Sequence, residues 1–202
     1  MFKRVSGFFL SHIAANVYIY CICVFFLVIG IIVGVVSGSG FENNAYFTEF
    51  FANLKSYSAG GYVKDGFVHS LVLTLLIFLA GISPLGFAAI PLAVSYKGFV
   101  TGYTVSAFFS VYGAKTFLFI ILGIIPSALF WIPAYMYGAV TGMLSSCCFF
   151  RILRRKSVNN ISDRVSGLLI SSVILFVGVV FSKFTEIFLI PEMLNIVGVL
   201  YT

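Results

Sequence analysis

The first uninterrupted apolar stretch of the chain, residues 17–36, most constrains what this sequence can fold into. It contains 20 residues and no charged side chain. At about 1.5 Å per residue, an α-helix of this length spans about 30 Å, which is the thickness of the hydrocarbon core of a bilayer. Because a cleavable signal sequence has an apolar region of only about 7–15 residues, we expect this run to stay as a membrane-spanning helix.

The composition extends this expectation to the whole chain. Of the 202 residues, 61% are hydrophobic and 9% are charged, whereas soluble domains carry about 25% charged residues. Such a chain cannot cover a water-facing surface with polar groups, but it can face lipid. We therefore expect an all-α, polytopic transmembrane helix bundle that forms a single integral membrane domain over residues 1–202.

Prolines and glycines divide the apolar sequence into about five expected spans. The clearest break is Ser83-Pro84, because the residue before a proline is disfavoured in helical geometry. Residues 116–150 are too long for one straight crossing, so that helix is expected to kink, tilt or protrude. The expected spans are residues 17–36, 67–82, 86–111, 116–150 and 167–190.

Basic residues predict the orientation of these spans. Lys3 and Arg4 precede the first span, and residues 151–165 hold five basic residues and one acid. Since cytoplasmic loops are enriched in Lys and Arg, the N-terminus and this basic loop are both expected in the cytoplasm. An even number of crossings must then separate them, which places the C-terminus outside the cytoplasm.

Two divisions of the central region satisfy this count. Residues 67–112 could cross twice and residues 113–150 once, or the reverse. The first division is preferred, because Ser83-Pro84 followed by Gly86 makes a better turn than the sequence around Pro126.

The most polar segment, residues 37–66, is expected to be an extracytoplasmic loop. Apolar side chains recur there at three- and four-residue spacing between polar ones, which predicts an amphipathic helix in the membrane interface that ends at Gly60-Gly61. This helix either anchors the loop among lipid headgroups or docks a partner. Residues 192–202, after Pro191, are expected to lie on the surface. The candidate docking residues are Tyr46, Phe47, Phe50, Phe51, Leu54 and Tyr57.

Glycines spaced four residues apart recur in three of the expected spans. Small residues at this spacing lie on one helix face and let a second helix approach closely. We interpret them as helix-packing residues: Gly30, Gly34, Gly98, Gly102, Gly138 and Gly142.

Lys97 lies within the apolar run of residues 67–112. A lysine near the centre of a bilayer costs about 2.5–3.5 kcal/mol on insertion scales, so its ammonium is expected to face protein, water or an interface. No carboxylate lies within one helical turn. One interpretation is that it binds carbonyl groups near a proline and locks the bundle; the other is that it lines a polar cavity. We group it with the prolines as buried polar or structural residues: Pro84, Lys97, Pro126 and Pro133.

The sequence does not contain a residue pattern typical of a catalytic or metal site. The histidines are far apart, and the cysteines lie in or at the end of apolar segments without the spacing of metal ligands. The net charge of +6 is concentrated beside apolar spans, so it does not indicate nucleic-acid binding. We expect no enzymatic activity, no catalytic residue, no cofactor and no metal, with the lipid bilayer as the surrounding partner.

Three segments of the chain carry a resemblance to a known family. They are Gly81-Ile82-Ser83 with Leu85-Gly86, the run from Lys97 to Thr104, and the run from Ile125 to Tyr135. In this order they resemble the core of the stage II sporulation protein M family. The wider family often has a histidine after the equivalent of Pro126 and a glutamate at the position of Trp131, whereas this chain has Ser127 and Trp131.

The resemblance implies a non-catalytic membrane scaffold or anchor required for forespore engulfment during endospore formation. In the family, such a protein recruits or localises the peptidoglycan-degrading stage II sporulation proteins D and P to the septum. The implied location is the cell membrane, at the septal or engulfing membrane of the mother cell. The alternative function is a small permease or channel in which Lys97 and the broken helices line a path.

Overall fold

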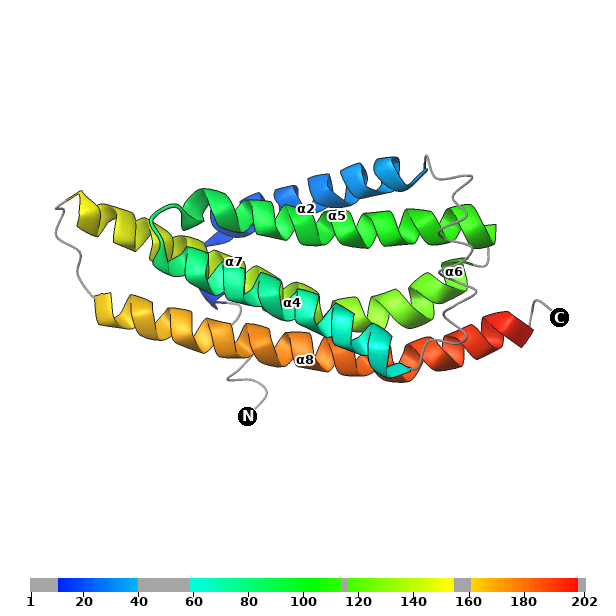
Figure 1. Ribbon diagram of the computed structural model, residues 1–202. Helices are drawn as coiled ribbons and strands as arrows, with labels where there is room; N and C mark the ends of the chain where they lie inside the picture. The colour runs from blue at the N-terminus through cyan, green and yellow to red at the C-terminus, as the bar shows by residue number, and fades with distance from the viewer. Residues whose placement is uncertain (1–10, 40–58, 114–115, 155–160, 200–202) are drawn as a thin grey trace.

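The computed structural model describes residues 11–39, 59–113, 116–154 and 161–199 (Figure 1). Over these residues the chain is a bundle of helices without a strand. This confirms the expected all-α membrane helix bundle. The helices are α2 (Val17–Ser39), α4 (Ala59–Ile82), α5 (Gly86–Tyr112), α6 (Thr116–Phe119), the π-helical turn η2 (Ile120–Ile124), α7 (Ile125–Leu153) and α8 (Ile161–Val199).

Three of these helices are long and apolar enough to cross a membrane. They are α2, α7 and, within α8, the segment Val165–Thr185, while Phe67–Ile82 of α4 is a shorter apolar helix. Large apolar side chains are exposed on α2 and α8, including Phe25 at 62% and Phe181 at 56%. Lipid is the solvent that suits such surfaces, so the chain is a membrane protein.

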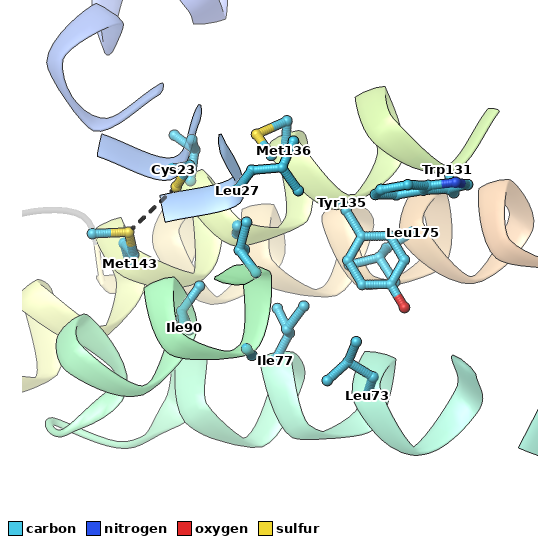
Figure 2. Packing of buried hydrophobic residues seen from close by; sticks show 14 of the residues in the cluster. Cys23, Leu27, Leu73, Ile77, Ile90, Trp131, Tyr135, Met136, Met143 and Leu175 are labelled. Carbon is cyan, nitrogen blue, oxygen red and sulfur yellow. Dashed lines mark hydrogen bonds between the residues drawn. The ribbon is translucent and has the colours of Figure 1, made fainter. Parts of the chain in front are cut away.

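Helix α7 is the central element of the bundle. It contacts α2, α4, α5 and α8, and every residue from 134 to 143 is buried. Side chains from the surrounding helices pack against it to form the core shown in Figure 2. The labelled core residues are Cys23, Leu27, Leu73, Ile77, Ile90, Trp131, Tyr135, Met136, Met143 and Leu175.

Helix α2 lies on the other side of α5 from α4 and packs mainly along α5 (Figure 1). The turn between α4 and α5, the end of α7 and the start of α8 all lie at one end of the bundle. The start of α4, the end of α5 and the end of α8 lie at the opposite end.

The turn at Ser83-Pro84 is fixed by a side chain of α7. The hydroxyl of Ser146 donates to the carbonyl oxygen of Ser83 at 2.8 Å and accepts from the backbone N–H of Phe87 at 2.9 Å. Within the turn, the backbone N–H of Gly86 donates to the same carbonyl oxygen of Ser83 at 3.1 Å. A hydroxyl from a third helix therefore satisfies two backbone groups where α4 ends and α5 begins.

Two predicted helix ends were wrong. Helix α4 begins at Ala59 and passes through Gly60-Gly61, so residues 59–66 continue the helix. Helix α8 passes through Pro191 and ends only at Val199, so residues 192–199 belong to it. The preference of glycine and proline to end helices is local, and tertiary context overrides it.

The interruption in residues 116–150 is a π-helical turn. It occupies Ile120–Ile124, between α6 and α7, and Pro126 follows it in the first turn of α7. A proline has no N–H to donate, and in the first helical turn none is required. Wider π turns are a known cause of helix deviation, which accounts for how this long segment departs from a straight helix.

Candidate functional site

The charged side chain of Lys97 lies against two aromatic rings inside the bundle. Its ammonium nitrogen is 5.4 Å from the centroid of the Trp131 ring and 5.9 Å from that of Tyr135. Both rings belong to α7, one turn apart, and they meet edge to face with centroids 5.8 Å apart. A cation over an aromatic face gains about 0.5–1 kcal/mol at exposed sites and about 2 kcal/mol when desolvated, so at the half-buried Lys97 the contact offsets part of the cost of a charge in a membrane.

The sequence does not indicate that aromatic rings are the partners of Lys97. The lysine comes from α5 and both rings from α7, so the contact joins two helices that are adjacent in space but separated in the chain by α6 and η2. Because Trp131 and Tyr135 are four residues apart, they present their rings on the same face of α7.

Tyr135 extends this contact to a third helix. It is almost completely buried, and its hydroxyl donates to the carbonyl oxygen of Ser70 in α4 at 3.3 Å. Two turns earlier in α7, the hydroxyl of Ser127 lies 2.9 Å from that of Ser182 in α8. Polar side chains of α7 thus bond to α4 and α8, while its rings face the lysine of α5.

Glycines on α2 allow its backbone to touch α5. A β-carbon at Gly30 would overlap the carbonyl oxygen of Ser95, and one at Gly34 would overlap that of Phe99. Both positions are buried although α2 is largely exposed. Any larger residue would push the two helices apart.

Glycines on α5 make the reciprocal contact with α2. A β-carbon at Gly98 would overlap the carbonyl oxygen of Leu27, and one at Gly102 would overlap that of Ile31. We call these four glycines, Gly30, Gly34, Gly98 and Gly102, the glycine seam. Its backbones interlock from both sides, so it is held by close van der Waals packing rather than by large side chains.

Gly138 and Gly142 do not face one common helix. Gly138 lies against Leu175 of α8, whereas a β-carbon at Gly142 would come within 2.9 Å of the Ile90 side chain in α5. The α-carbon of Gly81 in α4 also lies beside Gly142. These two glycines therefore let α7 approach different neighbours, as suits the central helix of the bundle.

The three prolines predicted as buried or structural lie in different surroundings. Pro84 is in the α4–α5 turn and Pro126 in the first turn of α7, and both are half-buried. Pro133 is inside α7 with an exposed side chain. The candidate docking residues Tyr46, Phe47, Phe50, Phe51, Leu54 and Tyr57 lie outside the described residues.

The structure does not bring the two histidines together. His12 contacts Tyr20 and Tyr137, while His69 lies against Tyr96. In the part of the chain that the structure describes, no group of three or more His, Cys, Asp or Glu side chains is placed to hold a metal ion.

Trp131, Tyr135 and Ser146 were not identified as site residues from the sequence. The spacing of the two aromatic residues, one turn apart and facing the same way, was the available signal. For Ser146 the sequence gives no signal, because a serine that bonds to a turn 63 residues away looks like any other serine in an apolar helix.

Together these features define a class of protein: an integral membrane helix bundle whose interior polar groups and glycines join its helices to one another. A family model described as SpoIIM, Stage II sporulation protein M, matches residues 22–189. The chain therefore belongs to the stage II sporulation protein M family and is a sporulation-related membrane protein. Searches of curated proteins and of solved structures returned no match.

Proposed function

We propose that this protein is a non-catalytic membrane scaffold required for forespore engulfment, and that it recruits or positions the stage II sporulation proteins D and P at the septum. The family match over residues 22–189 is the observation that carries the proposal. It extends from the second turn of α2 to the last third of α8, so it includes most of the packed bundle.

The interior polar groups contact neighbouring helices, and this favours a scaffold function. Lys97 stacks on rings of α7, Ser146 fixes the α4–α5 turn, and Ser127 bonds to α8. Each of these groups contributes to joining helices. A scaffold requires that its helices keep fixed positions while its outer surfaces are presented to partners.

A transport function would instead need Lys97 to face a path for a solute. A flux assay on reconstituted protein, comparing the wild type with Lys97→Met, separates the two functions. The scaffold proposal predicts no flux that depends on Lys97, and a Lys97-dependent flux would favour a permease or channel.

The partner-docking part of the proposal is assigned to the apolar face that the sequence predicts for residues 46–57. We expect Phe50→Asp and Tyr57→Asp to leave the protein in the membrane fraction while proteins D and P lose their septal position, because a carboxylate would disrupt an apolar contact. Asn53→Asp is the matched control, since it adds the same charge among the polar residues of that segment. Normal partner localisation in the Phe50 and Tyr57 variants would show that this docking face is wrong.

A further inference from the structure

A thiol and a thioether meet in the core, where α2 contacts α7. The Sγ of Cys23 in α2 donates to the Sδ of Met143 in α7 across 3.7 Å (Figure 2). Cys23 is 0% exposed and Met143 is 1% exposed, and both belong to the apolar core cluster. Thiolate and thioether are the two soft sulfur ligands that proteins offer to metal ions. Here two helices bring one of each into direct contact.

The separation of the two sulfur atoms suits a metal ion bound between them. With metal–sulfur bonds of about 2.3 Å, sulfur atoms 3.7 Å apart subtend an angle of about 105–110° at the ion. This is close to a tetrahedral bond angle, so both sulfur atoms can reach one ion with little movement of either helix. The ion keeps an open side for a further ligand.

Charge selects a monovalent soft ion for this position. A Cys23 thiolate with Cu(I) is neutral overall, whereas the same thiolate with a divalent ion leaves a net charge among apolar side chains, which is costly. A divalent ion would also lack ligands, because within the described residues no three His, Cys, Asp or Glu side chains are grouped. Thiolate and thioether ligands select Cu(I) among the first-row metals.

We infer that Cys23 and Met143 bind one Cu(I) ion between α2 and α7. The S–H bond of Cys23 breaks, its sulfur binds the ion as a thiolate, and a lone pair of the Met143 sulfur binds the other side. Copper stays Cu(I) throughout, and the thiol proton passes to solvent. The inference goes beyond the scaffold function and does not depend on which partners the protein has.

Polar groups beside Cys23 can carry this proton away. Tyr20 lies one turn before Cys23 in α2, and its hydroxyl is 3.2 Å from Nδ1 of His12, which lies against the ring of Tyr137. Tyr20 and His12 are both half-buried, so they link the neighbourhood of Cys23 to the outside. Since α2 packs mainly along α5, the bound ion adds a direct bond from α2 to the central helix.

The test uses the full chain, purified in detergent without added thiols and titrated with Cu(I) against the chelator bathocuproine disulfonate. Copper retained per protein is measured by mass spectrometry, and X-ray absorption at the copper edge identifies the ligand atoms. The chain has four cysteines, so the parent for the titration carries Cys21→Ser, Cys147→Ser and Cys148→Ser. We expect this parent to retain one Cu(I) with sulfur neighbours.

Two variants assign the ligands. Cys23→Ser with the other three cysteines present should not retain the ion, and Met143→Leu in the parent should lower the affinity for Cu(I) on the order of tenfold or more. Circular dichroism confirms that each variant is folded. Equal retention by Cys23→Ser, or copper bound without sulfur neighbours, would overturn the inference.

Thermal unfolding of the wild type gives a measurement that needs no variant. One equivalent of Cu(I) should raise its melting temperature, because a ligand that binds the folded bundle stabilises it. If Cu(I) neither stays bound against the chelator nor raises the melting temperature, the contact between Cys23 and Met143 is a packing contact only and the inference is wrong.

Discussion

The carbonyl oxygen of Leu27 in α2 occupies the position that a β-carbon at Gly98 in α5 would need. No side chain rearrangement can relieve that overlap, because both groups are backbone or attached directly to it. The α2–α5 pairing therefore depends on glycine at this position.

We predict that Gly98→Ala destabilises the protein by about 1–3 kcal/mol, the usual cost of overpacking a tight contact. The loss of stability is measured by unfolding the wild type and the variant in a titration with denaturing detergent. Gly167→Ala is the matched control, since nothing lies within 4 Å of the β-carbon it would add. Because alanine is favoured over glycine in a helix by roughly 1 kcal/mol, this control should be neutral or stabilising. If both substitutions changed stability equally, the close contact at the glycine seam would not be the cause of the destabilisation by Gly98→Ala.

Lys97 and Trp131 should be energetically coupled. Replacing Trp131 with leucine leaves the ammonium without one of its rings, whereas Lys97→Met removes both the contact and the cost of placing a charge in the membrane. A double-mutant cycle on unfolding free energy should give a coupling of about 0.5–2 kcal/mol.

Phe130 supplies the control cycle for this pair. It neighbours Trp131 in α7, but its ring stacks on Phe181 of α8. Lys97→Met and Phe130→Leu should therefore be additive. Additivity of the Lys97 and Trp131 substitutions as well would show that the cation–π contact contributes nothing.

Ser146→Ala should lower the free energy of unfolding by about 1–3 kcal/mol. The substitution leaves the carbonyl of Ser83 and the N–H of Phe87 without this hydrogen-bond partner in a half-buried turn. Ser172→Ala removes a hydroxyl that donates to Leu169 within α8 at an exposed position, and it should change stability much less. Hydrogen exchange at the α4–α5 turn provides a second measurement. Unchanged exchange at Phe87 in Ser146→Ala would contradict the assigned role.

The all-α class and the turn at Ser83-Pro84 could be predicted from the sequence because both depend on local properties. An apolar run of 20 residues has few alternatives to a membrane helix, and a proline after a serine in such a run disfavours continuation. The sequence does not predict the continuation of α4 through Gly60-Gly61 and of α8 through Pro191, since the preferences of single residues are overridden by tertiary context.

The contacts between helices could be predicted only in part. Glycine spacing indicated which faces pack closely, but Gly138 and Gly142 face different helices, which depends on the position of α7 among four neighbours. The aromatic partners of Lys97 depend on how α5 and α7 are aligned along each other. That alignment results from the whole bundle and leaves no pattern within α5 itself.

The central claim, that this protein holds the engulfment enzymes in place, is tested most directly by crosslinked co-purification from sporulating cells. Photocrosslinking residues are placed singly within residues 41–58 and 192–202, with Phe25 on the exposed face of α2 as the control position. The account predicts that stage II sporulation proteins D and P are recovered with crosslinks from the first two segments and not from position 25. Recovery of neither protein from any site in these segments, with the protein present at the septum, would contradict it.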